Sequence, residues 1–222
     1  MRLRRRIKTA GIVLLFAAAA ALAANTLFYL NLDSSFGFLR HKQNAVATGW
    51  YLPAFYAHIF AGALVLLAGF FQFQEKLRKK WPTTHRLTGY VYVTGILAFA
   101  APGGMVMAMF IGRGAVVLSS FVLQCTLWIV FTTLAVLSAR RREFRGHEQW
   151  MIRSFALTLA AITLRLYIFG ASWFFDLSTP AVYGVFAWLS WVPNLILGEI
   201  IIRRKITSRA RQNPTQESLI AN

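Results

Sequence analysis

Six apolar stretches, separated by short polar connections, constrain the fold of this chain more than any other feature. A stretch of about 20 apolar residues crosses the hydrocarbon core of a bilayer as a helix. Lipid admits only helices or closed barrels, because unpaired backbone groups are costly there. We therefore predict an all-α bundle in residues 1–205 that contacts the lipid bilayer. The predicted transmembrane helices are residues 9–30, 51–73, 87–110, 115–138, 153–175 and 180–202.

Composition excludes several other classes of protein. Only 14% of the 222 residues are charged, whereas soluble domains carry about 25%. The net charge of +17 does not indicate nucleic-acid binding, because the charges lie in short runs between apolar stretches. Cys125 is the single cysteine, which excludes a disulfide framework and a cysteine zinc site. The sequence has no phosphate-binding loop or nucleophile elbow, so a membrane oxidoreductase is the one enzyme class that we retain.

Lysine and arginine residues are distributed unequally between the two ends of the predicted bundle. Twenty of them lie in the amino-terminal run, in residues 74–86, in residues 139–153 and in the tail, whereas the opposite connections carry three. Positively charged connections remain in the cytoplasm. We therefore predict a multi-pass protein of the bacterial inner membrane with both termini in the cytoplasm. Residues 206–222 are polar and basic, and we expect them to form a disordered cytoplasmic tail.

Arg165 is the remaining cation, and it lies inside the fifth apolar stretch. It follows Arg153 by twelve residues, which places it about 18 Å into the membrane at the rise of an α-helix. A charge at this depth costs at least about 2.5 kcal/mol, and such charges commonly mark functional sites. Glu199 is a poor partner because it lies near the basic end. The counter-charge is therefore expected from a ligand.

Three further polar side chains lie in the interiors of other apolar stretches: His58, Gln124 and Asn194. We predict that they line a buried site together with Arg165, because lipid cannot solvate such groups. The site is expected to open outward past Gly103. Its expected ligand is a small anion or a quinone-like molecule, with His58 as hydrogen-bond donor or proton carrier. The protein would then be a transporter, a sensor or a quinone-handling protein.

Small residues and prolines add expectations about helix packing. Gly62 and Gly69 share one helix face with His58, and another helix can approach closely there. Pro102, followed by two glycines, should kink the third helix. One face of the fifth helix is small and polar and should point into the bundle; its residues are Ser154, Thr158, Ala161, Arg165 and Ser172.

A structural role for Arg165 is the alternative to ligand binding. In this interpretation the guanidinium satisfies backbone carbonyls that Pro102 or Pro193 leaves without a donor. Arg165 would then only fix the packing of helices. The protein would be a membrane scaffold without a ligand.

His85 and His147 precede the third and fifth predicted helices and are expected at matched depth near the basic end. Two histidines on different helices are the minimum for bis-histidine haem b, and neighbouring arginines could hold the propionates. A metal held with Glu148 has no fixed ligand spacing in support, so we predict no metal site. A haem b-binding electron-transfer protein is therefore an alternative function.

Three sequence blocks resemble a known family. They are His58-x3-Gly62, HRLTGYVY at 85–92 and HEQWMIRSFALTLAAITLR at 147–165. Together they resemble an uncharacterised family of bacterial predicted membrane proteins, over residues 50–170. This resemblance implies a multi-span inner-membrane protein and no established activity. A weaker likeness is to cytochrome b561 and ferric-reductase six-helix haem proteins, but Gln124 stands where those proteins place a histidine.

Overall fold

The computed structural model describes residues 2–212, whose helices are joined by turns and loops and which contain no strand. By length and composition, six of its helical segments can cross a membrane, so the predicted all-α fold with six spans is confirmed. The six segments are Thr9–Asn31, Tyr51–Gln72, Pro82–Met109, Ala115–Arg140, Phe144–Ala171 and Pro180–Arg209.

Several of these segments contain more than one helical element. The longer helices are α1 (Arg2–Thr26), α3 (Tyr51–Gln72), α5 (Pro82–Thr94), α7 (Ala115–Arg140), α8 (Phe144–Thr158), α9 (Ala160–Ala171), α10 (Pro180–Leu189) and α11 (Val192–Gln212). The shorter ones are η1 (Leu27–Asn31), η2 (Gly37–Lys42), α2 (Gln43–Val46), α4 (Glu75–Lys80), η3 (Gly95–Ala100) and α6 (Ala101–Met109).

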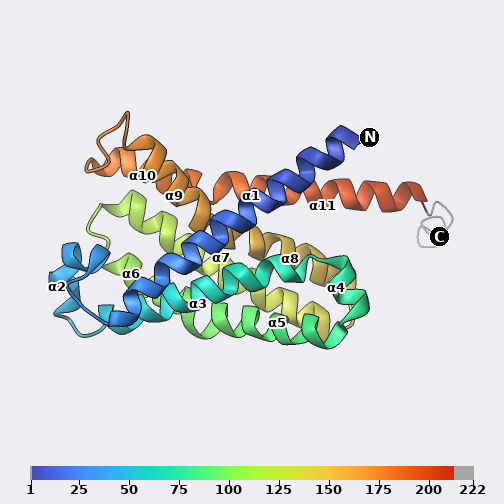
Figure 1. Ribbon diagram of the computed structural model, residues 1–222, viewed down its shortest axis with the longest axis horizontal. Helices are drawn as coiled ribbons and strands as arrows, with labels where there is room; N and C mark the ends of the chain where they lie inside the picture. The colour runs from blue at the N-terminus through green and yellow to red at the C-terminus, as the bar shows by residue number, and fades with distance from the viewer. Residues whose placement is uncertain (1, 213–222) are drawn as a thin grey trace.

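The two ends of the bundle differ in their connections. The start of α1, α4 and the carboxyl end of α11 lie at one end, which we call the basic end (Figure 1). The opposite end, which we call the loop end, carries residues 27–50, 110–114 and 172–179. Both ends of the described chain therefore lie on one side, as an even number of spans requires.

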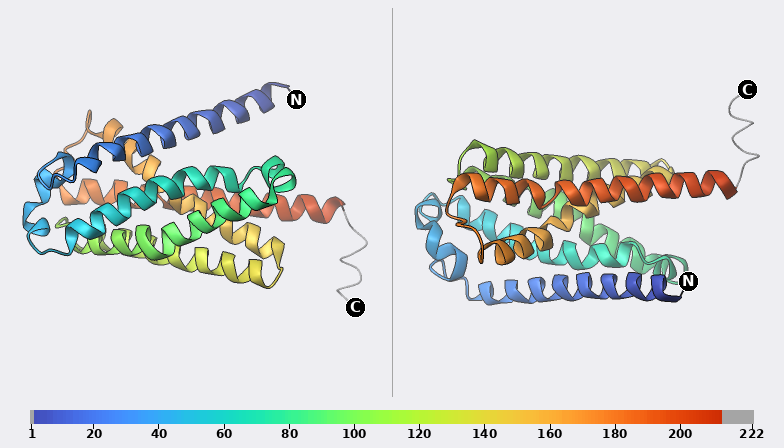
Figure 2. Two further views of the ribbon diagram at one scale, coloured as in Figure 1. Left: turned by 60° about the horizontal axis from the view of Figure 1, so that its bottom comes forward. Right: turned by 90° about the horizontal axis from the view of Figure 1, so that it is seen from above.

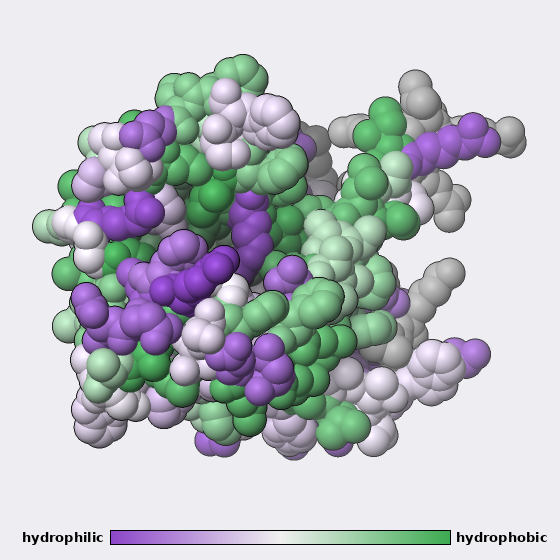
Figure 3. Space-filling view, turned by 60° about the vertical axis from the view of Figure 1, so that its left-hand side comes forward, coloured by the Kyte–Doolittle hydropathy of each residue, from purple (hydrophilic) through white to green (hydrophobic). Residues whose placement is uncertain are grey.

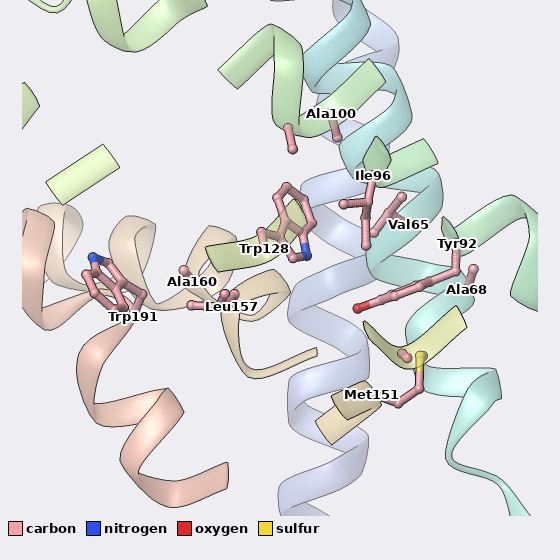
Figure 4. Packing of buried hydrophobic residues seen from close by; sticks show 12 residues of the cluster. Val65, Ala68, Tyr92, Ile96, Ala100, Trp128, Met151, Leu157, Ala160 and Trp191 are labelled. Atoms are coloured by element: carbon pink, nitrogen blue, oxygen red, sulfur yellow. The ribbon is translucent and has the colours of Figure 1, made fainter. Parts of the chain in front are cut away.

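The packed centre of the bundle is formed by α3, α5, α7 and α8 with the start of α11. Figure 4 shows this core, in which Tyr92, Trp128 and Leu157 belong to one buried cluster. By contrast, α1 lies along the outside against α3 (Figure 2). Only 6% of the apolar window of α1 is buried. Most of this first span therefore faces the lipid.

A chain of buried hydroxyl groups ties α5, α7 and α8 together. The Tyr92 hydroxyl is directed into the core (Figure 4) and bonds with Ser154 Oγ and Thr158 Oγ1, both at 2.9 Å. Thr132 Oγ1 lies 2.8 Å from Ser154 Oγ, and Trp128 Nε1 donates to Thr158 Oγ1 at 3.1 Å. Each of these side chains has a partner, so the network fixes the helices' register without an unsatisfied polar group.

Three of the spans are interrupted, and two of the interruptions are associated with proline. A π-helical turn, η3, precedes Pro102, which cannot donate a backbone hydrogen bond. The chain also bends at Ser190 ahead of Pro193, where the Ser190 carbonyl accepts from Thr163 Oγ1 at 2.5 Å and from the Asn194 amide at 3.0 Å. The third interruption, between α8 and α9, lies in a segment without proline or glycine.

The spans are longer at the basic end than the sequence suggested. The third begins at Pro82 and the fifth at Phe144, since helices start in the polar connections before they enter the membrane. The expected disorder from residue 206 is not seen in the described part of the tail, because α11 continues to Gln212. Glu148 holds this extension through Lys205 at 2.6 Å and Arg209 at 2.7 Å. Residues 213–222 lie outside the described residues.

Close helix approach occurs at Gly69 and Gly103 and not at Gly62. A Cβ atom at Gly69 would overlap the Phe155 ring, and one at Gly103 would lie 2.5 Å from the Ala54 carbonyl oxygen. A Cβ at Gly62 would meet nothing within 4 Å. Of the two glycines expected to admit a neighbouring helix, only Gly69 does so.

Candidate functional site

Arg165 lies on α9 and is exposed, so the site expected to be buried is open on its Arg165 side. The reason is the bend at Leu159, which turns α9 away from the packed axis of α8. Ser154 and Thr158 remain in the core network, and Arg165 no longer continues their face. Its Nη1 atom donates to the Ala161 carbonyl of its own helix at 2.9 Å.

Side chains from three other elements lie within electrostatic reach of the Arg165 guanidinium. Tyr29 of η1, Tyr183 of α10 and His58 of α3 lie close enough to interact with it electrostatically. Arg165 is therefore accessible and within electrostatic reach of side chains on three other elements. Figure 3 shows the loop end, where hydrophilic side chains gather among hydrophobic surfaces.

His58 is held in one orientation by the interrupted third span. Its Nδ1 atom donates to the Ala100 carbonyl at 2.7 Å, which leaves Nε2 as the free ring nitrogen. The ring packs against Gly104, where an added Cβ would lie 2.9 Å from Nδ1. The expected opening past Gly103 is absent, because α3 and α6 are in direct backbone contact at that point.

Gln124 faces the bundle interior with an unused carboxamide. Ser120, one turn before it on α7, accepts a hydrogen bond from Trp191 Nε1 at 3.0 Å. Trp128, one turn after it, donates to Thr158 Oγ1 at 3.1 Å, so both side chains point inward. Residues four apart share a helix face, so Gln124 points the same way. Its side chain is half-buried, and no group in the described part of the chain bonds to it.

Asn194 is not brought to these residues. Its Nδ2 atom donates to Thr163 Oγ1 and to the Ser190 carbonyl, both at 3.0 Å. Thr163 and Arg165 are two residues apart on α9, which places their side chains on nearly opposite faces. Asn194 therefore stabilises the bend before Pro193 and lies away from the Arg165 side chain.

The histidines of the basic end form a second, separate group. His147 Nδ1 donates to the Ala135 carbonyl of α7 at 2.9 Å, so its Nε2 remains free. His85 Nδ1 is buried without a hydrogen-bond partner, and His85 interacts electrostatically with His147. The Glu148 carboxylate is taken up by ion pairs with α11. In residues 2–212, no three His, Cys, Asp or Glu side chains gather into a metal-binding group.

Sequence reasoning missed four side chains that interact with Arg165 or with one another: Tyr29, Lys42, Arg113 and Tyr183. Arg113 lies 4.4 Å from the centre of the Tyr183 ring, and Tyr183 interacts electrostatically with Arg165. Lys42 interacts electrostatically with Arg113. A signal was present, since Lys42 and Arg113 are two of only three cations in the connections opposite the basic runs.

Comparison with protein families gave one match. The profile described as "Predicted membrane protein (DUF2306)" matches residues 55–202, which include His58, His85, His147 and Arg165. The chain belongs to this family. The matched residues of this DUF2306 protein do not include α1 or the connection that carries Lys42. Comparisons with curated proteins and with solved structures gave no match.

Proposed function

We propose that the protein binds a small anionic or quinone-like ligand at Arg165, His58 and Gln124, as a transporter, a sensor or a quinone-handling protein. The observation that carries the proposal is the unused bonding capacity of these groups. Arg165 has one hydrogen bond for its five N–H donors, His58 keeps Nε2 free, and the Gln124 amide is unpaired among the described residues. Inside a membrane such groups are costly unless a ligand or water completes them.

The scaffold alternative requires Arg165 to bond carbonyls at the interrupted helices, whereas the side-chain bonds found next to the two prolines come from other residues. His58 bonds the Ala100 carbonyl ahead of Pro102. Thr163 and Asn194 bond the Ser190 carbonyl ahead of Pro193. Arg165 bonds only within its own helix. Its guanidinium is thus available to a ligand, and its planar fork suits a carboxylate, a phosphate or a quinone oxygen.

The distribution of charge supports an orientation for the site. The basic end carries the arginine and lysine runs, and we propose that it faces the cytoplasm of a bacterial inner membrane. The loop end would then face outward. A ligand would reach Arg165 from the outside, between α9, α10 and η1.

Replacement of Arg165 tests the proposal. Arg165→Met should insert and fold like the parent but lose thermal stabilisation by the probes, sodium phosphate and the short-chain quinone ubiquinone-1. Leu166→Met is the matched control, because Leu166 is an exposed neighbour on the same helix. It should respond like the parent. If Arg165→Met is stabilised as strongly as the control, the site assignment is wrong.

A second candidate function, binding of haem b, is favoured by the unpartnered Nδ1 of buried His85 beside His147. The residues fit the group, since a backbone bond orients His147 in the manner common for metal-bound histidines. His85 and His147 would supply the axial nitrogens, and Arg78 lies within electrostatic reach of His85. Haem b would supply one-electron transfer.

The visible spectrum separates this candidate from the first. Protein purified from haem-replete cells should show a Soret band that His85→Ala and His147→Ala each abolish. His41→Ala, which changes a histidine at the loop end, should leave the band unchanged. A colourless parent protein excludes haem binding and leaves the Arg165 proposal untouched.

A further inference from the structure

The loop end contains a hollow of about 460 Å³ that the proposed site does not use. This volume lies within the range of about 300–1,000 Å³ that small-molecule sites occupy. Its lining is largely polar, and three of its side chains are basic, those of Arg40, His41 and Lys42. The other lining residues are Gln43, Asn44, Ala45 and Phe110. Figure 3 shows the hydrophilic surface of this end.

Two cations beside the hollow are held in place by backbone carbonyls. Lys42 Nζ donates to the carbonyls of Phe110 at 3.0 Å and Ile111 at 3.1 Å. Arg113 Nη1 donates to the Leu177 carbonyl at 2.6 Å. Neutral carbonyls fix both side chains without cancelling their charge, so the two cations remain close together and repel each other.

Among the described residues, no acidic side chain forms an ion pair with Lys42 or Arg113. Asp33 and Asp176, the two acids of the loop end, bond within their own turns to Ser35 and Ser178. The ion pairs identified in the described chain all lie toward the basic end, where they join Arg153 to Glu199 and α11 to Glu148. Both aspartates keep their charge, so the loop-end connections carry three cations, Arg40, Lys42 and Arg113, against two acids, which is a net charge of +1.

The electropositive region is continuous with the Arg165 site. Arg113 lies over the Tyr183 ring, and Tyr183 also interacts with Arg165. Burial, and then the charge of Arg113, lower the pKa of Lys42. An anion between these groups would relieve this repulsion, whereas a neutral quinone would not.

We infer that the Arg40–Lys42 hollow with Arg113 is a capture site for an oxyanion, a phosphate or carboxylate group, that then occupies the Arg165 site. This inference rests on the proposed function and selects the anionic class of ligand. The oxyanion is either a soluble ion or the phosphate of an anionic lipid headgroup. Both present the same chemistry to an arginine and lysine cluster.

Charge-removing variants of the capture site test the inference. Binding of inorganic phosphate is measured on detergent-purified protein at low salt, and binding of phosphatidylglycerol is measured in phosphatidylcholine nanodiscs. The double variant Arg40→Gln/Arg113→Gln should weaken binding at least about tenfold, which corresponds to about 1.4 kcal/mol. Arg86→Gln, which removes an exposed charge at the basic end, should bind like the parent.

The conservative change Arg113→Lys separates charge from packing. It keeps the charge and loses the planar contact with Tyr183, so near-parental affinity is expected. An effect as large as that of Arg113→Gln would overturn the electrostatic basis of the inference. Phosphate binding supports a soluble ligand, and binding of phosphatidylglycerol alone supports a lipid ligand. Binding of neither by the parent overturns the inference.

The two proposals fail in different ways. If Arg165→Met abolishes binding and the double variant binds normally, the proposed function stands and the capture site is wrong. If the double variant loses binding and Arg165→Met retains it, the capture site stands and the Arg165 assignment is wrong.

Discussion

Replacing Gly103 with alanine should separate α3 from α6 and destabilise the protein. The added Cβ would lie 2.5 Å from the Ala54 carbonyl oxygen and 3.0 Å from the His58 backbone nitrogen. Both obstructing atoms belong to the backbone of α3, so no side chain can rotate away. Ordinary contact begins near 3.4 Å, and the helices must therefore move apart by about 1 Å at this point.

The cost of this movement can be worked from the contacts that it disturbs. Overpacking a well-packed interface costs about 1–3 kcal/mol. The His58–Ala100 hydrogen bond of 2.7 Å joins the same two spans, and its loss adds about 0.5–1.5 kcal/mol. We expect Gly103→Ala to lower the free energy of unfolding by about 2–4 kcal/mol.

Unfolding in mixed micelles of increasing SDS content measures this change, and Gly62→Ala is the matched control. An added Cβ at Gly62 meets nothing within 4 Å, so the alanine should be neutral or stabilise the helix by about 0.5–1 kcal/mol. The His58 ring resonances should shift in Gly103→Ala and not in the control. Equal stability of the two variants would refute the close approach of α3 and α6.

Three further predictions concern other contacts. Tyr92→Phe should lower stability by about 1–2 kcal/mol, because it leaves its buried hydroxyl partners incompletely bonded. Unfolding in SDS measures this change. The control Tyr90→Phe, at a side chain that is 70% exposed, should leave stability unchanged. Glu199→Gln should lower the free energy of unfolding by about 1 kcal/mol or less, because the bidentate bond from Arg153 is partly exposed to solvent. In 0.5 M salt the Debye length is about 4 Å, and the stability difference between parent and variant should shrink. A difference that stays the same in salt would contradict an ionic origin. The pKa of Lys42 is lowered in the folded protein, so Lys42 binds its proton more weakly there than in the unfolded chain. Stability should therefore rise with pH between the lowered pKa and 10.5. Lys42→Gln should remove this part of the pH dependence, and equal slopes of stability against pH for parent and variant would contradict the prediction.

Hydropathy was sufficient to predict the architecture, because each span must be apolar over a fixed length. The predicted stretches at 51–73 and 115–138 agree with Tyr51–Gln72 and Ala115–Arg140 to within two residues. The first residues of the spans that begin at the basic end were less predictable. There the helices begin in polar sequence, as at Phe144, where hydropathy carries no signal.

The site was only partly predictable, because bends redirect side chains that periodicity places together. No proline or glycine near Leu159 predicts the bend there. The bend nevertheless moves Arg165 from the packed face of the helix to an exposed face. Asn194 was expected in the site from its depth, but depth does not give its direction around the helix. His58 and Arg165, predicted at similar depth, lie within electrostatic reach of each other.

The peripheral position of α1 has a consequence for how ligand preference can diverge within the family. The family match begins at residue 55, so the matched portion leaves out the first span. The end of that span, η1, nevertheless supplies Tyr29, which interacts electrostatically with Arg165. If Arg165 binds the proposed ligand, substitutions there would alter the surroundings of the ligand while the remaining five spans keep their mutual packing. Under the proposed function, selectivity and foldability would then depend on largely separate parts of the polypeptide.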